Sequence, residues 1–212
     1  MITLSGPIGA GKTTLARLLA KDLGTEAFLE PVDDNPIIDD YYKGTGEEHN
    51  QYAFLMQVYL LNRRFEAIKQ AMQRDNNVLD RSIYEDRIFM ELNYMRGQIT
   101  KNEWETYLSL FDNVMEELPY AAHKKAPDLM VYIDVSYETM AKRIAKRGRP
   151  FEQGPELKDY YTELLWLYDE WVKGYSASPI VIIDGDAHDY AENYADRHAV
   201  LARIERRLGP NA

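Results

Sequence analysis

Short apolar runs alternate with longer amphipathic stretches along the chain. Five runs are short and apolar enough to be buried strands, at residues 1–5, 27–29, 78–80, 129–135 and 179–184. Elsewhere apolar residues recur at helical spacing, which predicts helices at residues 12–23, 50–75, 83–95, 100–119, 137–146, 157–175 and 190–208. Strands that alternate with helices form a parallel sheet covered on both faces. We therefore predict an α/β fold of the P-loop kinase type, with a five-stranded parallel sheet flanked by helices.

The loop after the first apolar run matches the phosphate-binding pattern G-x-x-x-x-G-K-[ST]. Small residues let backbone N–H groups surround phosphate oxygens, and the helix N-terminus adds partial positive charge. An ordinary Gly-rich turn is the alternative, but a strand before the loop and a helix after it are the context that a phosphate loop requires. Lys12 is expected to reach the outer phosphates and Thr13 to ligate Mg²⁺. The predicted ATP-binding residues are Gly6, Pro7, Ile8, Gly9, Ala10, Gly11, Lys12, Thr13 and Thr14.

Charged residues follow two other predicted strands. The carboxyl ends of parallel strands face the ligand crevice in such folds, so Glu30, Asp80 and Arg81 are expected at the site. Glu30 could accept a proton from a substrate hydroxyl or merely cap a loop, and the local sequence leaves both interpretations open. Asp80 is a candidate for holding Mg²⁺ through water, and Arg81 for binding a phosphate or a carboxylate.

A cluster of basic residues stands out because the chain as a whole is acidic. The 212 residues carry a net charge of −10, which disfavours nucleic-acid binding because the phosphate backbone would repel the protein. A phosphate-handling site must then supply its own cations. We interpret residues 143–155 as a mobile lid whose arginines close over phosphoryl groups, in preference to a solvated helix end that complements its own dipole. The cluster comprises Lys142, Arg143, Lys146, Arg147 and Arg149, with Glu152 just beyond it.

Composition and length narrow the class further. The chain has no cysteine, which excludes disulfides and cysteine-ligated zinc. No apolar run approaches membrane-span length and the phosphate loop begins at residue 6, so we expect one cytoplasmic domain over residues 1–212 without membrane contact. Apolar stripes at residues 52–65 and 104–118 favour a core or a subunit interface. Gln57 and Arg64 share a helix face, which by itself favours a solvated surface.

Three further motifs accompany the phosphate loop. They are Glu30-Pro31-Val32, the run Asp-Arg-Ser-Ile-Tyr-Glu-Asp-Arg at residues 80–87, and Lys146-Arg147-Gly148-Arg149. Together the four motifs resemble those of the deoxyribonucleoside kinases, and most of all the bacterial deoxyadenosine kinases. The resemblance extends from residue 1 to residue 186, with the motifs in the same order and at similar spacing.

The resemblance implies roles in catalysis for the matching residues. Glu30 would be the base that takes the proton from the 5′-hydroxyl. Arg81 would hold that carboxylate and the transferring phosphoryl group, and Asp80 would assist magnesium placement. The lid arginines would be Arg143, Arg147 and Arg149.

The resemblance also implies how the nucleoside is bound. Tyr42 and Glu152 would hydrogen-bond the sugar 3′-hydroxyl, and Gln57, Arg64 and Asp86 would contact the edge of the base. Whether Tyr41 or Tyr42 meets the sugar stays open at this point. Asn35 departs from the pattern, because many animal members have Trp there.

The function implied is transfer of the γ-phosphoryl group of ATP, with Mg²⁺, to the 5′-hydroxyl of deoxyadenosine. Deoxycytidine or deoxyguanosine would be weaker substrates. A homodimer is also implied, with the stripes at residues 52–65 and 104–118 as the contact. Two alternatives are a thymidylate-type nucleoside monophosphate kinase and a nucleotide-binding regulatory subunit that does no chemistry.

Overall fold

The structure, a computed structural model, describes residues 1–30, 35–44, 47–73, 77–121 and 126–209. Its strands form one five-stranded sheet in the order β2-β3-β1-β4-β5, and every neighbouring pair is parallel. The predicted α/β fold with a parallel five-stranded sheet is therefore confirmed. The strands are β1 (Ile2–Ser5), β2 (Ala27–Phe28), β3 (Val78–Asp80), β4 (Leu129–Asp134) and β5 (Ile180–Asp184).

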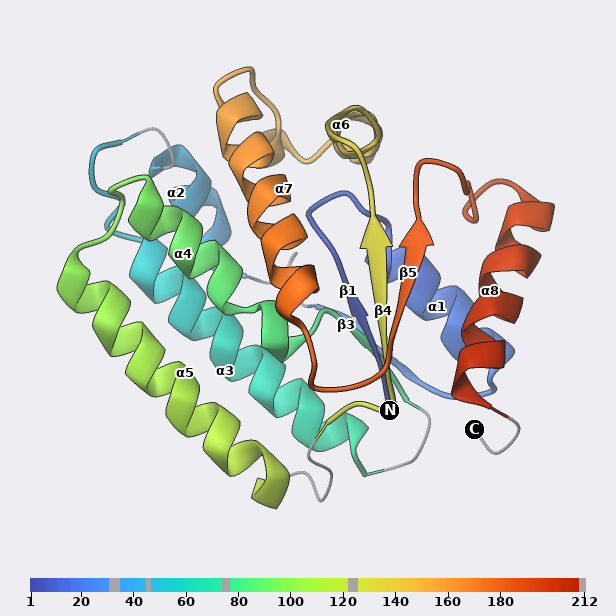
Figure 1. Cartoon of the computed structure of the whole chain (residues 1–212). Coiled ribbons are helices and arrows are strands. Elements are labelled where there is room, and N and C mark those ends of the chain that lie inside the picture. The colour runs from blue at the N-terminus through green and yellow to red at the C-terminus, as the bar shows by residue number, and fades with distance from the viewer. Residues whose placement is uncertain (31–34, 45–46, 74–76, 122–125, 210–212) are drawn as a thin grey trace.

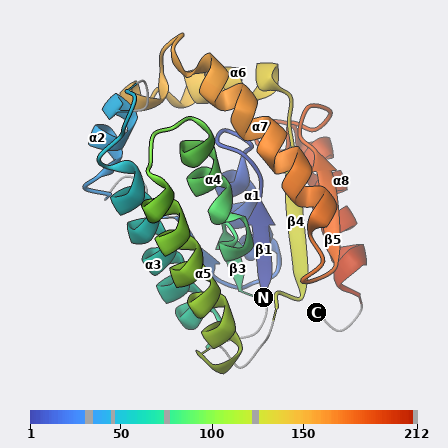
Figure 2. The same cartoon turned by 60° about the vertical axis from the view of Figure 1, so that its left-hand side comes forward.

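Helices cover both faces of this sheet, as Figures 1 and 2 show. One face carries α1 (Lys12–Asp22) and α8 (Tyr194–Leu208), and the other carries α4 (Arg87–Met95) and α7 (Leu157–Gly174). Buried side chains of all four helices join those of the strands in one apolar core. The continuous apolar run of β4 is buried from Leu129 to Ile133, which explains why it lacks polar alternation.

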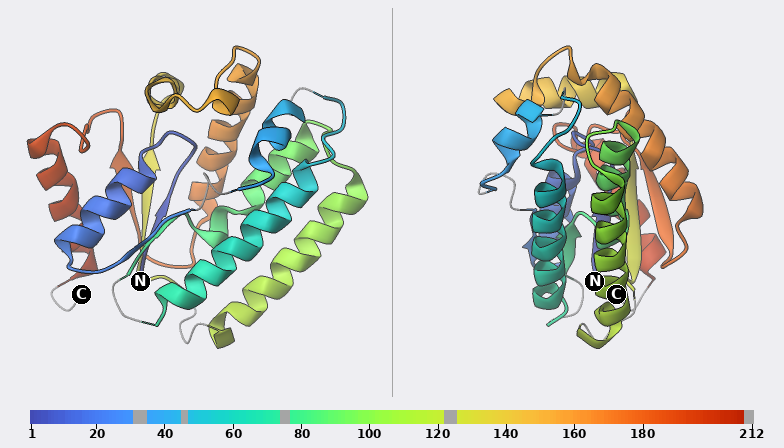
Figure 3. Two further views of the ribbon diagram at one scale, coloured as in Figure 1. Left: turned by 180° about the vertical axis from the view of Figure 1, so that it is seen from behind. Right: turned by 90° about the vertical axis from the view of Figure 1, so that its left-hand side faces the viewer.

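A second apolar core lies beside α4 and includes Leu79 of β3. It is formed mainly by α3 (Ala53–Ala71) and α5 (Lys101–Ala121), which lie side by side (Figure 3). Helix α5 begins at the predicted capping box, where Thr100 Oγ1 accepts from Glu103 N at 3.2 Å and Glu103 accepts from Thr100 N at 2.7 Å. The apolar stripes of both helices thus fill a core, and the predicted dimer contact stays a prediction.

Several helix limits differ from the sequence prediction. The helix expected to end at Pro119 runs to Ala121, because a proline in the last turn costs only one backbone hydrogen bond. The helix expected at residues 83–95 is split into the 3₁₀ helix η2 (Ile83–Glu85) and α4, with Asp86 at the junction. The helix expected at residues 50–75 is α3, which begins at Ala53 and ends at Ala71, so it is shorter than predicted at both ends.

Two short helices were not predicted, and they build one rim of the site. They are α2 (Ile38–Lys43) and the 3₁₀ helix η3 (Pro150–Glu152), which contact each other. Helix α2 is stabilised by a residue that lies beyond its C-terminus, because Asn50 Nδ2 donates to the carbonyl of Tyr41 at 2.8 Å. The last helix starts at Tyr194 rather than at residue 190, because the Asn193 side chain caps it by accepting from two backbone N–H groups.

All five strands run in the same direction, so their carboxyl ends meet at one edge, at the top of Figure 1. The phosphate loop leaves β1 there, and Glu30 and Arg81 follow β2 and β3. Helix α6 (Tyr137–Arg147) crosses the same edge after β4. Among the described residues no helix is long and apolar enough to cross a membrane.

Candidate active site

A cavity of about 860 Å³ opens at this edge of the sheet. Its wall brings together most of the residues singled out from the sequence. Gly6, Pro7, Ala10 and Asp86 are not among the residues that line the cavity. Those that do are Ile8, Gly9, Gly11, Lys12, Thr13, Thr14, Glu30, Asn35, Tyr41, Tyr42, Gln57, Arg64, Asp80, Arg81, Lys142, Arg143, Lys146, Arg147, Arg149 and Glu152. Pro31 and Val32 of the Glu-Pro-Val motif lie outside the described residues.

The phosphate loop takes a conformation that depends on glycine. Gly11 has φ +98°, and a Cβ there would lie 2.4 Å from the hydroxyl of Tyr190. The Lys12 Nζ curls back and donates to the carbonyls of Gly6 at 2.7 Å and Pro7 at 2.8 Å. Burial, with the neighbouring Arg81 guanidinium, lowers the pKa of Lys12 to about 7. A group that binds beside this ammonium and carries negative charge would restore its proton.

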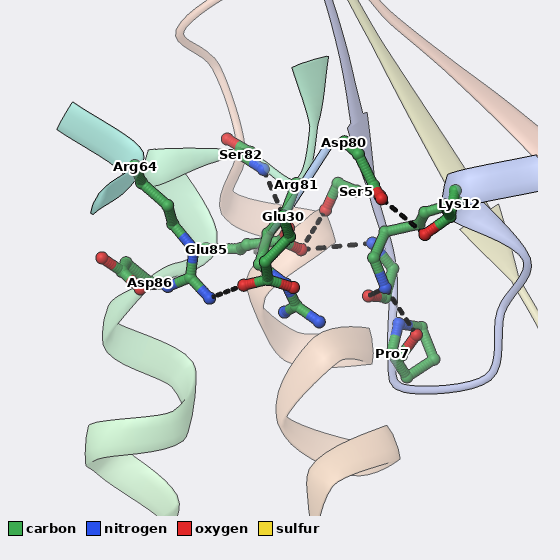
Figure 4. Close-up of polar contacts among 12 residues, drawn as sticks. Ser5, Pro7, Lys12, Glu30, Arg64, Asp80, Arg81, Ser82, Glu85 and Asp86 are labelled. Atoms are coloured by element: carbon green, nitrogen blue, oxygen red, sulfur yellow. Dashed lines mark hydrogen bonds and ion pairs between the residues drawn. The ribbon is translucent and has the colours of Figure 1, made fainter. Parts of the chain in front are cut away.

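Glu30 sits between two arginines at the centre of the site (Figure 4). One oxygen accepts from Arg64 at 2.5 Å and the other from Arg81 Nε at 2.9 Å. Burial raises the pKa of this carboxyl, but Arg81 and Arg64 outweigh it and hold the pKa at about 2. Glu30 is therefore ionised at neutral pH, and it lines the cavity.

Arg81 is held in an unusual backbone conformation. Its φ is +91°, in the left-handed region that residues other than glycine rarely adopt. The side chain donates from Nη1 to the Tyr168 hydroxyl at 2.8 Å and lies 4.9 Å from the ring centre of Phe89. Burial opposes its charge, yet Glu30 more than compensates and keeps the pKa of the guanidinium well above its usual value. Strain of this kind persists where surrounding contacts fix a residue for a task.

The predicted magnesium residues are adjacent. Thr13 Oγ1 donates to Asp80 Oδ2 at 2.5 Å, while Asp80 Oδ1 is buried and has no hydrogen-bond partner among the described residues. Burial raises the pKa of Asp80. Mg²⁺ prefers oxygen ligands and commonly uses one or two protein groups together with substrate phosphates. A hydroxyl and a carboxylate with an unused oxygen, beside the phosphate loop, fit that ion.

Arg64 and Asp86, both predicted to meet the base, form an ion pair with each other. Asp86 is fully buried, so Arg64 is the member of the pair that faces the cavity. Gln57 also faces it, and its Oε1 is buried without a hydrogen-bond partner in the described part of the chain. The part of the cavity lined by Arg64 and Gln57, called the base end below, thus offers guanidinium donors and an amide oxygen that can accept a hydrogen bond.

The short helices α2 and η3 bring Tyr42 and Glu152 to the same rim. The ring of Tyr42 packs 5.2 Å from that of Phe151, and burial together with Tyr161 and Glu152 raises the pKa of Tyr42 well above its usual value. Tyr41 also lines the cavity, but its hydroxyl lies 3.1 Å from both Asn93 Oδ1 and the Tyr160 hydroxyl.

The basic cluster divides into two parts. Arg143 lies within α6 and donates to the carbonyls of Ala10 and Gly185, both at 2.7 Å, so it braces the phosphate loop. Arg147 donates to Glu152 Oε2 from Nε at 3.0 Å and from Nη2 at 2.5 Å. Gly148 ends the helix in the left-handed conformation, and Arg149 follows on the cavity wall. Residues 143–147 of the predicted lid are thus helical.

Two residues at this site carried no role in the sequence interpretation. Glu85 is fully buried and accepts from Ser5 Oγ, Gly6 N and Ser82 N. Its position in a Ser-x-x-Glu capping box was a visible signal. The Tyr190 hydroxyl donates to Ala10 O at 3.0 Å, across 180 residues, and no local pattern indicates that contact.

Comparison with known proteins identifies the family. The sequence profile described as Deoxynucleoside kinase matches residues 2–208. The chain belongs to the deoxynucleoside kinase family. It is therefore an enzyme, a phosphotransferase, and not a regulatory subunit without activity. Membership of this family, and not of the thymidylate kinases, also decides against the thymidylate-type alternative.

Similar proteins are named for different deoxynucleosides, among them deoxycytidine. The deoxyguanosine kinase of Lactobacillus acidophilus is 51% identical over 98% of this chain and 90% of its own length. The deoxyadenosine kinase of the same organism is 47% identical over 98% of this chain and 96% of its own. Among solved structures, deoxyadenosine kinase from M. mycoides with bound dATP matches at 31% identity and a TM-score of 0.80, over 96% of this chain and 98% of that one.

Proposed function

We propose that this kinase transfers the γ-phosphoryl group of ATP to the 5′-hydroxyl of a purine 2′-deoxynucleoside. The proposal rests on the position of Glu30. Its carboxylate is paired with Arg64 and Arg81 and lines the same cavity as the phosphate loop. A regulatory nucleotide-binding protein would need the loop but not this carboxylate.

The residues divide the chemistry between them. Glu30 accepts the proton of the 5′-hydroxyl, and Arg81 stabilises charge on the transferring group. Because the transition state of phosphoryl transfer is loose, a carboxylate with a low pKa suffices, since the proton leaves late. Thr13 and Asp80 would hold Mg²⁺, which when bound neutralises charge on the phosphate oxygens.

The base end of the cavity supports a purine. An arginine can donate twice to the O6 and N7 atoms of guanine, and a glutamine amide can pair with the N6 and N7 atoms of adenine. Arg64 and Gln57 supply these two groups on the cavity wall. Deoxyadenosine, predicted from the sequence, and deoxyguanosine both fit, and the names of the relatives at 51% and 47% identity include both bases.

The first experiment measures initial rates with Mg·ATP and each of the four natural deoxynucleosides, with adenosine and thymidylate alongside. We expect kcat/KM for deoxyadenosine or deoxyguanosine to exceed that for deoxycytidine and thymidine at least tenfold. The faster purine identifies the preferred base. Activity confined to thymidine, to thymidylate or to adenosine would contradict the proposal.

For the sugar we propose Tyr42 and Glu152 as the partners of the 3′-hydroxyl. The ring of Tyr42 packs against Phe151, the residue before Glu152, whereas the Tyr41 hydroxyl already has Asn93 and Tyr160 as partners, which supports this choice over Tyr41. Tyr42→Phe should reduce the preference for the deoxynucleoside over its 2′,3′-dideoxy analogue. Tyr41→Phe is the matched control and should keep that preference. The reverse pattern would assign Tyr41 to the sugar.

Arg147 and Arg149 remain our candidates for a lid that closes over the phosphoryl groups. Their present partner is Glu152, with Arg149 Nη1 at 3.6 Å from Oε1, so closure would exchange a carboxylate for a phosphate. We also propose that the protein is a homodimer and is located in the cytoplasm.

A further inference from the structure

Glu85 is a fully buried carboxylate, and it contacts both the phosphate loop and the segment that follows Arg81. One oxygen, Oε2, accepts from Ser5 Oγ at 2.5 Å and from the N–H of Gly6, the first glycine of the phosphate loop, at 3.1 Å. The other oxygen accepts from Ser82 N at 3.0 Å. Figure 4 shows Glu85 between the phosphate loop and the segment that carries Arg81.

A helix cap alone does not explain this arrangement. The chain contains a second capping box, at Thr100, in which Glu103 is 28% exposed. Glu85 has no exposed surface, although its cap on the three-residue η2 needs only the bond to Ser82 N. Burying a carboxylate is costly unless it is fully hydrogen-bonded. The bonds to Ser5 and Gly6 reach another strand, β1, and serve no cap.

The Tyr168 hydroxyl accepts from Arg81 Nη1 at 2.8 Å. Burial raises the pKa of Tyr168, and the Glu85 carboxylate raises it further. The charge of Glu85 therefore acts on the hydroxyl that holds the Arg81 side chain. On the backbone side, Glu85 fixes Ser82, the residue next to the strained Arg81.

We propose that Glu85 is a positioning residue for phosphoryl transfer, which holds Arg81 in register with the phosphate loop. The inference deepens the proposed function and rests on it. The loop binds the donor, while Arg81 orients Glu30 and meets the transferring group, so a small displacement between them separates donor from acceptor. A small misplacement of these groups lowers the rate of the chemical step more than it lowers the affinity for either substrate.

Glu85→Gln tests the proposal with little change in volume. An amide has one acceptor oxygen, so its NH₂ group must face the N–H of either Gly6 or Ser82. We expect kcat to fall about 10- to 100-fold, the loss of a hydrogen bond to a charged group. The dissociation constants for ATP and for the deoxynucleoside, measured separately, should stay within about threefold. Glu103→Gln, the glutamate of the other capping box, is the matched control and should keep kcat.

A double-mutant cycle with Arg81→Lys distinguishes positioning from a structural role. If Glu85 acts through Arg81, Glu85→Gln should lower kcat less than about threefold further in the Arg81→Lys background. Multiplicative effects of the two changes would overturn the proposal. So would an unchanged kcat in Glu85→Gln, or equal loss of kcat and of ATP binding.

Tyr168→Phe keeps the test decisive if Glu85→Gln does not fold. It removes only the hydroxyl between Arg81 and Glu85, and we expect kcat to fall about 3- to 10-fold with substrate binding retained. An unchanged kcat would overturn the link. All rates are measured with the deoxynucleoside that the unaltered enzyme phosphorylates fastest. A wrong base assignment therefore fails in the substrate survey and leaves this comparison intact.

Discussion

Replacing Glu30 by Gln tests the centre of the proposed site through both stability and rate. The carboxylate is paired with Arg64 and Arg81 and is only 12% exposed. Its neighbours lower its pKa from an ordinary 4.5 to about 2. That change corresponds to roughly 3 kcal/mol, because each tenfold shift in an equilibrium is worth about 1.4 kcal/mol.

Glu30→Gln should therefore lower the free energy of unfolding by roughly 3 kcal/mol at pH 7, which for a chain of this size is a Tm decrease of about 10 °C. Because the folded-state pKa is depressed, this stability is present above the unfolded-state pKa and is lost as pH falls toward 2. The gap between variant and unaltered enzyme should be constant above about pH 5 and shrink below it. Scanning calorimetry or denaturant titration at several pH values measures it.

The same substitution should reduce kcat about 10²- to 10⁴-fold, the usual effect of removing a general base, while ATP still binds. Quenched single-turnover assays and isothermal calorimetry measure the two quantities. Glu26→Gln, an exposed site at the other end of β2, is the control and should change neither. A Glu30→Gln enzyme with unaltered turnover would refute the assignment of Glu30 as the base. A stability gap that does not depend on pH would refute the electrostatic argument.

Three further predictions concern the phosphate loop. ATP binding should take up close to one proton per site at about pH 8.5 and much less at about pH 6, because the pKa of Lys12 is about 7 and phosphates favour its charged form. Calorimetry in buffers of different ionisation enthalpy measures the proton uptake, and equal uptake at the two pH values would contradict the prediction. Gly11→Ala should weaken ATP binding more than tenfold, since its Cβ would meet Tyr190 at 2.4 Å, whereas Gly174→Ala, with nothing within 4 Å, should have no such effect. Tyr190→Phe removes one bond to Ala10 and should raise KM for ATP about 2- to 10-fold with KM for the deoxynucleoside unchanged; steady-state kinetics that show the opposite would disprove a role in donor binding.

The sequence was sufficient for the sheet and for the residues at its edge. Apolar runs predict strands because each lies in a parallel sheet covered on both faces, and the position of a residue directly after a strand is enough to bring Glu30, Asp80 and Arg81 together. The phosphate loop was equally predictable, because its glycines and Lys12 lie within one short stretch of sequence, residues 6–12. Local spacing alone, however, favoured a solvated face for Gln57 and Arg64, and only the family resemblance placed them at the base.

The features that were missed depend on distant contacts. Helix α2 is six residues long and is held by Asn50 and by Gln98, whose Nε2 lies 3.4 Å from the carbonyl of Gly44. Nothing within residues 38–43 alone requires that helix. The contact of Tyr190 with Ala10 is likewise absent from any local pattern. The sequence predicts a helix end at Pro119 because proline usually ends a helix. In a final turn, however, the lost backbone hydrogen bond costs little stability.

The charged groups at the centre of the site form a shared network, and this has a consequence for how they act. Arg64 is paired with both Glu30 and Asp86, while Arg81 is paired with Glu30 and donates to the Tyr168 hydroxyl. A base that hydrogen-bonds to Arg64 therefore competes with Glu30 for the same guanidinium. Weakening that pair raises the pKa of Glu30 and makes it a better proton acceptor. Binding of the correct base at Arg64 would then make Glu30 a stronger catalytic base. The effects of substitutions at Arg64 and Glu30 on kcat should accordingly be non-additive.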